Sequence, residues 1–237
     1  CILYYKYTNH NTKNINLNVL KFNWKKLYND GWPLVFSGIT LSINQRVDQI
    51  FLKWKLGLET VGNYAASVKI IEMISIIPYL LARGMFPYFI KLFQSDENKY
   101  YYKISIYYKV AFIIGSLTGI IIYTFSESII FMTFGNEYSD AIFYLKIYSF
   151  SLPISFVGAL NSLHLKVVAR YKSILGRQIV NLILNLVLNY LLIDIFGGIG
   201  AAYSTLIALI NSNFIYDLFD YKKSNINKLK FLIVRNF

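Results

Sequence analysis

The 237-residue chain has few charged residues and almost none of the residues that form disulfides or bind transition metals. Charged types make up 15% of it, against about 25% in ordinary soluble domains, so lipid is the predicted solvent for much of the chain. Cys1 is the single cysteine, which excludes an internal disulfide framework. His10 and His164 are far apart and have no cysteine near them, so no zinc or iron site and no cofactor are expected.

Sequence motifs of the common membrane and nucleotide enzymes are also missing. Gly57 to Gly62 has the glycine spacing of a phosphate-binding loop but continues with Asn63 and Tyr64 instead of Lys and Ser or Thr. There is no nucleophile elbow and no metal-binding helix motif. We therefore expect no enzyme and no ATP hydrolysis, so any work must draw on a gradient or on downhill flow of the substrate.

Long apolar runs are what the chain has instead, and apolar types reach 56%. A membrane-spanning helix needs about 20 mostly apolar residues. Six runs qualify: Trp32–Leu52, Val61–Phe86, Tyr107–Phe125 (followed by a short patch, Ile129–Phe134), Ile142–Leu165, Leu175–Phe196 and Ile199–Phe219. The sequence predicts an all-α integral membrane protein with a six-helix transmembrane bundle over residues 32–219.

The basic residues between these runs fall almost entirely on one side of the predicted membrane. The net charge is +12, which in a soluble protein would suggest nucleic acid. Of the 24 Lys and Arg, 19 fall in or beside alternate gaps, whereas the opposite loops hold only Lys53 and Lys55. The positive-inside rule then places both ends of the bundle, including the C-terminus, in the cytoplasm. Membrane lipids, not nucleic acid, are the expected partners.

The segments outside the bundle give three further predictions. Residues 1–5 are apolar and read as the end of a preceding transmembrane helix, which makes the chain a C-terminal piece of a longer protein. Residues 6–31 are expected to be a cytoplasmic linker, and residues 220–237 a basic cytoplasmic tail. Within the linker, Leu20–Leu27 fits either a helix on the inner membrane surface or an extension of the first span.

Four ionisable residues interrupt the first two spans. Arg46 and Asp48 lie in the first, and Lys69 and Glu72 lie one turn apart in the second. Charges inside a span are costly, and they usually face the bundle interior or a wet cavity. Because the two helices are sequential and antiparallel, these groups are expected at similar depth. They fit either a cationic lining for an anionic substrate or an ion-paired set that joins the two helices.

A row of carboxamides marks the fifth span. Gln178, Asn181, Asn185 and Asn189 follow spacings of three, four and four, which place them on one helical face. Carboxamides both donate and accept hydrogen bonds. The row fits sugar hydroxyls in a cavity, or hydrogen bonds between helices.

Several stretches together resemble a known family. They are residues 31–37 (GWPLVFS), 47–52 (VDQIFL), 61–66 (VGNYAA), 69–72 (KIIE), 134–138 (FGNEY) and 197–202 (GGIGAA), with Asn181, Asn185 and Asn189. In order and spacing they are similar to the second half of bacterial polysaccharide (O-antigen type) flippases of the MOP transporter superfamily.

The resemblance implies one of two bundles in a transporter of about 12 to 14 spans, with the missing N-terminal half as partner. It implies a multi-pass protein of the bacterial cytoplasmic (inner) membrane that flips a polyprenyl-diphosphate-linked oligosaccharide for O-antigen or capsule synthesis. Arg46 and Lys69, with Asn181 and Asn185, would then bind the substrate, and Asp48 and Glu72 would form a coupling group or ion pair. Alternatives are a MATE-like drug or cation antiporter, and a membrane polysaccharide polymerase or glycosyltransferase. The short outer loops count against the last.

Overall fold

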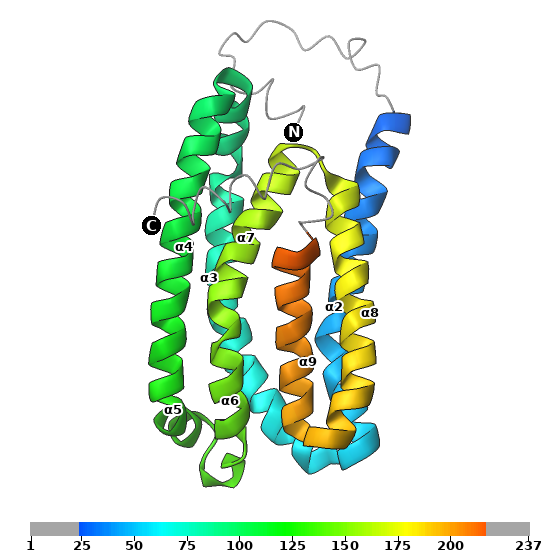
Figure 1. Cartoon of the computed structure of the whole chain (residues 1–237), viewed down its shortest axis with the longest axis vertical. Helices are drawn as coiled ribbons and strands as arrows, with labels where there is room; N and C mark the ends of the chain where they lie inside the picture. The colour runs from blue at the N-terminus through cyan, green and yellow to red at the C-terminus, as the bar shows by residue number, and fades with distance from the viewer. Residues whose placement is uncertain (1–23, 217–237) are drawn as a thin grey trace, which may run out of the picture.

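The computed structural model describes residues 24–216 and shows an all-helical bundle, as the sequence predicts (Figure 1). The long helices run roughly side by side along one axis. In chain order the elements are α2 (Trp24–Leu56), α3 (Leu58–Ser95), α4 (Glu97–Thr124), α5 (Ser126–Thr133), the 3-10 turn η2 (Asn136–Tyr138), α6 (Ala141–Ser149), α7 (Ser151–Val167), α8 (Tyr171–Phe196), α9 (Gly198–Ile210) and the π-helical turn η3 (Asn211–Ile215).

Fewer of these helices meet the length and hydropathy of a membrane span than the six predicted. Among the described residues four do, namely α3, α4, α8 and the continuous Gly198–Ile215, and the bent pair α6–α7 makes a fifth if it is one span. Helix α2 does not, although it has 33 residues. The reason lies in its composition, because Asn44, Gln45, Arg46 and Asp48 interrupt the apolar run.

The predicted fourth span is broken into α6 and α7, which meet at an angle of 47°. Pro153 stands in the first turn of α7 and has no backbone N–H to donate to Ser149 four residues earlier, which explains the bend. Helix α4 fits closely against this bend. A Cβ on Gly115 would lie 2.8 Å from Pro153 Cα, and one on Gly119 would lie 2.9 Å from the Ser149 carbonyl oxygen. Glycine at both positions lets the two backbones approach, as is common between membrane helices.

Successive turns alternate between the two ends of the bundle (Figure 1). Those at Gly57, η2 and Gly197 lie at one end, and those at Asp96 and Arg170 lie at the other. Gly57 and Gly197 have positive φ angles of 92° and 60°, which glycine adopts without strain.

The N-terminal linker and the C-terminal tail lie mostly outside the described residues. The predicted helix end at 1–5, the linker up to residue 23 and the tail at 220–237 are among them. The first described helix begins at Trp24 and continues without a break through the predicted first span.

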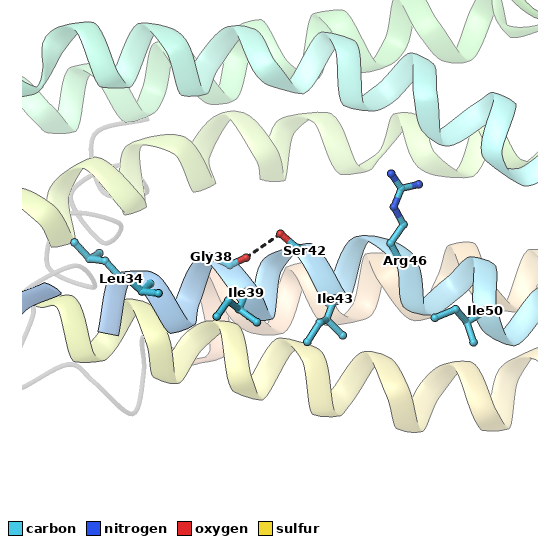
Figure 2. A pocket seen from close by; sticks show the side chains of 8 residues that line it. Leu34, Gly38, Ile39, Ser42, Ile43, Arg46 and Ile50 are labelled. Atoms are coloured by element: carbon cyan, nitrogen blue, oxygen red, sulfur yellow. Dashed lines mark hydrogen bonds between the residues drawn. The ribbon is translucent and has the colours of Figure 1, made fainter. Parts of the chain in front are cut away.

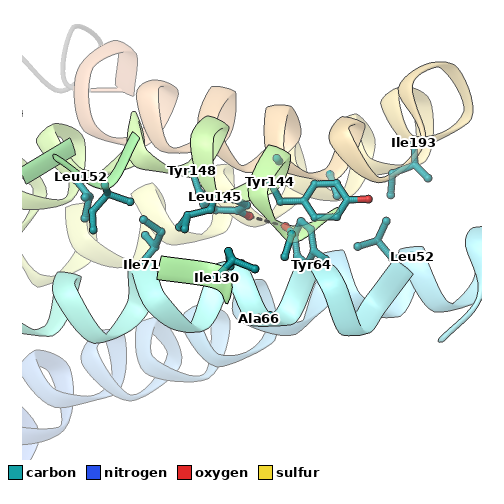
Figure 3. Packing of buried hydrophobic residues seen from close by; sticks show 14 residues of the cluster. Leu52, Tyr64, Ala66, Ile71, Ile130, Tyr144, Leu145, Tyr148, Leu152 and Ile193 are labelled. Carbon is teal, nitrogen blue, oxygen red and sulfur yellow. Dashed lines mark hydrogen bonds between the residues drawn. The ribbon is translucent and has the colours of Figure 1, made fainter. Parts of the chain in front are cut away.

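Apolar side chains form two main cores, one toward each end. The first gathers Leu52, Tyr64, Tyr148 and Ile193 with neighbours from α3, α5, α6 and α9 (Figure 3). The second gathers Phe89, Tyr100 and Tyr108 with α7 residues. In both cores, buried tyrosines bring hydroxyl groups into the bundle interior, where they need hydrogen-bond partners.

Candidate functional site: a buried carboxylate and an exposed guanidinium on one helix

Asp48 is the centre of a buried polar cluster, with 5% of its surface exposed. Its Oδ1 accepts hydrogen bonds from Asn185 Nδ2 at 3.0 Å and Asn189 Nδ2 at 2.8 Å. Its Oδ2 accepts from the hydroxyls of Tyr64 at 2.6 Å, Thr205 at 2.6 Å and Tyr148 at 3.3 Å. The Tyr64 and Tyr148 hydroxyls also contact each other.

These six residues come from five helices: Asp48 from α2, Tyr64 from α3, Tyr148 from α6, Thr205 from α9, and the two asparagines from α8. Figure 3 shows Tyr64 and Tyr148 side by side, among the apolar side chains of Leu52, Leu145 and Ile193. Hydrogen bonds to a charged acceptor are about twice as strong as those between neutral groups. A single carboxylate therefore links five helices near the end of the bundle where Gly57 and Gly197 turn.

Every donor to Asp48 in the described chain is uncharged. No Lys or Arg of residues 24–216 forms an ion pair with it. The oxygen atoms of the carboxylate, amide and hydroxyl groups in this cluster are ligands that suit a proton or a hard monovalent cation. One of them, Asn189 Oδ1, is buried and accepts no hydrogen bond from the described residues. The described chain holds no group of three or more His, Cys, Asp or Glu side chains that would bind a transition metal.

The carboxamide row of α8 lies inside the bundle. Asn181, Asn185 and Asn189 are 3%, 0% and 0% exposed. Asn185 Nδ2 also donates to Asn44 Oδ1 of α2 at 3.1 Å, and Asn189 Nδ2 donates to Asn185 Oδ1 at 2.9 Å. The structure thus places Asn185 and Asn189 in hydrogen bonds between α2 and α8. Asn181 makes none with described residues through its buried Oδ1.

Arg46 lies on the opposite side of α2 from Asp48 and is exposed. Two residues along an α-helix turn the side-chain direction by about 200°, so the two charges cannot share one face. Arg46 contacts Gln49 Oε1 at 3.4 Å, and no carboxylate of the described residues lies within ion-pair distance. It borders a hollow of about 710 Å³ whose other lining residues are Leu34, Val35, Gly38, Ile39, Ser42, Ile43 and Ile50 (Figure 2).

The four ionisable residues singled out from the sequence therefore do not form one set. Lys69 is exposed on α3, and Glu72 beside it is half-buried. Within residues 24–216, no ion pair joins any two of Arg46, Asp48, Lys69 and Glu72. One ion pair among the described residues links Lys55 Nζ to Asp194 Oδ1 at 2.7 Å, near the turns at Gly57 and Gly197.

Sequence reasoning missed three members of the Asp48 cluster: Tyr64, Tyr148 and Thr205. Aromatic and hydroxyl residues are common in apolar spans, and nothing in their spacing links them to an aspartate on another helix. The one available signal was the buried aspartate itself, which has to find donors in a low-dielectric interior.

A second polar cluster lies in the other half of the bundle. Tyr108 Oη of α4 donates to Asn161 Oδ1 of α7 at 2.7 Å, and Asn161 Nδ2 donates to the Asn213 carbonyl oxygen at 3.3 Å. Asn213 lies in η3, where the helix widens to a π-turn. Nearby, Tyr100 Oη and His164 Nδ1 lie 2.7 Å apart. These contacts join α4, α7 and η3, and the five residues are at most 9% exposed.

Comparison with known proteins agrees with this architecture. Residues 1–93 match the family model described as polysaccharide biosynthesis protein. The chain is 24% identical over 208 residues to the capsular polysaccharide biosynthesis protein CapF of Staphylococcus aureus, a match that covers 85% of this chain and 52% of that protein. The chain thus spans about half the length of this curated relative.

Two solved structures share the fold. One is a multidrug resistance MATE family transporter of the MOP superfamily in an outward-facing conformation, with a TM-score of 0.70. The other is a MOP superfamily transporter from Pyrococcus furiosus, with a TM-score of 0.68. Each is 16% identical, and the match covers 81% of this chain and 43% of the other. The resemblance to polysaccharide biosynthesis proteins is therefore confirmed, and the chain has the helical fold of part of a MOP superfamily transporter.

Proposed function

We propose that the chain supplies half of a membrane transporter that moves a polyprenyl-diphosphate-linked oligosaccharide across the bacterial cytoplasmic membrane for surface polysaccharide synthesis. The match to polysaccharide biosynthesis proteins supports the substrate class, and the fold supports transport. Within the structure, one observation carries the proposal: Arg46 is an exposed cation in an apolar hollow with no carboxylate partner among the described residues.

A guanidinium among apolar side chains needs an anion, because an unpaired charge in a low-dielectric setting is costly. Its planar fork of donors matches phosphate oxygens in pairs. A diphosphate that crosses the membrane needs such donors for the same reason. In this proposal Arg46 binds the diphosphate of the substrate.

Lys69 is the second proposed contact. Counted from the turn at Gly57, Arg46 and Lys69 lie at nearly equal depths on antiparallel helices, roughly 16 and 18 Å from it. Both side chains are exposed. Two cations at one depth would neutralise two phosphates, or a phosphate and an acidic sugar. Asn181 and Asn185, which are buried between helices, have no direct substrate contact in this proposal.

Asp48 is the proposed coupling group. It is a buried carboxylate with uncharged donors from four other helices. Gain or loss of a proton or a monovalent cation there would change hydrogen bonds on all of them at once, and thereby the balance between two arrangements of the bundle. Glu72 is half-buried and forms no ion pair with Lys69 within 4.0 Å, so it is less suited to this role than the buried Asp48.

The test uses the full-length protein in a strain that lacks it. The double variant Arg46→Gln, Lys69→Gln should lower surface polysaccharide by at least about tenfold at unchanged protein level, since each lost contact to a phosphate is worth about 1.5–3 kcal/mol. Lys53→Gln is the matched control, because Lys53 is an exposed lysine near the end of the same helix, α2. Normal export by the double variant would contradict the proposal.

A second candidate function is export of a cationic drug or exchange of cations. The observation that favours it is Asp48, a carboxylate that no basic side chain of the described residues neutralises, in a fold shared with a MATE family transporter. It predicts that Asp48→Asn abolishes drug resistance while Arg46→Gln, Lys69→Gln does not. The lipid-linked substrate predicts that the double variant abolishes polysaccharide export and leaves drug resistance unchanged.

A further inference from the structure

The outer face of α2 carries a shallow trough with a defined polarity. Its lining comes from one stripe of the helix, in which Leu34, Gly38, Ser42, Arg46 and Ile50 follow at intervals of four. Figure 2 shows these side chains along one helix, with Arg46 projecting away from it. No lining residue belongs to another helix, so the trough is an open surface feature of α2.

The floor of the trough is smooth and apolar. A Cβ at Gly38 would have no side chain of a more distant residue and no atom of another helix within 4 Å. Ser42 Oγ donates its hydrogen to the Gly38 carbonyl oxygen at 3.1 Å (Figure 2), so its donor is already used within the helix. Along the edge, Val35, Ile39 and Ile43 remain 62%, 51% and 48% exposed. Large apolar surfaces of this kind mark a contact with lipid or with another molecule.

Arg46 divides the trough unequally. Toward Leu34 the apolar lining continues for twelve residues, or about 18 Å, whereas toward Ile50 it continues for only four, or about 6 Å. The feature is therefore a long apolar track that leads to a single positive group. This pattern complements a molecule with one long hydrocarbon chain that ends in a negative charge.

We propose that this trough binds the isoprenoid chain of the lipid-linked substrate, with its diphosphate at Arg46 and its chain along Gly38 toward Leu34. The inference rests on the proposed function and adds to it the place and direction of the lipid part. Ordinary bilayer lipid would fill the trough equally well but would not need the arginine. A protein helix packed on it would have to bring a carboxylate to Arg46.

The experiment uses the purified full-length protein in nanodiscs and a polyprenyl diphosphate that carries a photoreactive group near the middle of its chain. Irradiation followed by peptide mass spectrometry should place the label on α2 between Leu34 and Ile43. Gly38→Leu, which fills the floor, should reduce labelling there at least about fivefold. The control is Gly84→Leu, because Gly84 lies on α3 with open space where a Cβ would be added, and the substitution changes helix propensity by the same amount.

Four results would overturn the proposal. One is labelling confined to other helices. Another is undiminished labelling of Gly38→Leu. The third is equal competition by phosphatidic acid with acyl chains, which would mean a general lipid contact. The fourth is a disulfide between Gly38→Cys and a cysteine in the remainder of the protein, which would show that a protein segment covers the trough.

Failure of the broader proposal is distinguishable from failure of this one. If the trough does not bind the isoprenoid chain, the Gly38→Leu variant should be labelled and should export polysaccharide normally, while the double variant Arg46→Gln, Lys69→Gln should still lower export. If the substrate class itself is wrong, the double variant exports polysaccharide normally.

Discussion

The two faces of α2 place their charged side chains in opposite environments, although Asp48 and Arg46 are only two residues apart. Asp48 faces inward and accepts hydrogen bonds from five side chains of four other helices. Arg46 faces outward, and its only described hydrogen bond is a long one to Gln49 of its own helix. Both are ionisable groups in a mostly apolar helix, but within the described residues only Asp48 is buried.

The difference predicts which substitutions lower stability, whether or not they also lower activity. The fold itself already supplies the groups that stabilise the carboxylate, so Asp48 is part of the architecture. No described residue supplies a carboxylate for Arg46, and its side chain remains exposed. Substitutions on the inner face should therefore lower stability, and substitutions on the outer face should lower activity alone.

Asp48→Ala should have the largest effect on stability. Removal of the carboxylate leaves several buried donors without an acceptor, each of which costs about 1–3 kcal/mol. Because these donors can partly re-pair, the expected net loss is on the order of 3–5 kcal/mol. It would appear as a sharp drop in the melting temperature of the detergent-solubilised protein. Gln45→Ala, an exposed change on the same helix, is the control, and equal melting temperatures would mean that Asp48 is not a structural centre.

Asn189 and Asn181, two asparagines on the same face of α8, should differ in how much stability is lost when each is replaced by leucine. Asn189→Leu removes the hydrogen bonds that Asn189 Nδ2 donates to Asp48 Oδ1 and to two oxygen atoms of Asn185, and should destabilise by roughly 1–3 kcal/mol. Asn181→Leu removes a buried amide whose Oδ1 has no described partner, so it should be neutral or stabilising. Thermal unfolding of both variants in the same detergent checks the pair. A larger loss for Asn181→Leu would contradict this assignment of the hydrogen bonds.

The sequence predicted some features of these residues correctly and others not. The length of the apolar runs predicted the all-helical bundle, and helical spacing placed the three asparagines on one face, which the structure buries together. The sequence also marked Arg46, Asp48, Lys69 and Glu72, but expected them at one place. Helical geometry alone separates Arg46 from Asp48, because a two-residue interval points side chains in opposite directions. Which face turns inward depends on contacts between distant segments, such as Asp48 with Thr205, and these have no local signal.

Tyr148→Phe should have a moderate effect. Its hydroxyl makes the longest of the bonds to Asp48, at 3.3 Å, and contacts the Tyr64 hydroxyl, while the ring remains packed against Tyr64. Loss of one such bond with the shape kept costs about 0.5–1.5 kcal/mol. Tyr64→Phe, which removes a 2.6 Å bond, should cost more in the same unfolding measurement. A larger loss of stability for Tyr148→Phe than for Tyr64→Phe would mean that the stronger hydrogen bond to Asp48 comes from Tyr148 of α6.

Arg46→Gln should have the smallest effect on stability and, in the proposed function, a large effect on activity. The side chain is exposed and has no ion pair with the described residues, so its loss should change the unfolding free energy by no more than about 0.5 kcal/mol. Export should nevertheless fall, because the lost group is the one that meets the phosphate. Arg46→Lys keeps the charge but not the bidentate fork, and should retain export only in part. The melting temperature and the export activity of Arg46→Gln should be measured beside those of Asp48→Ala. The two faces of α2 differ as described only if Asp48→Ala lowers the melting temperature and Arg46→Gln does not.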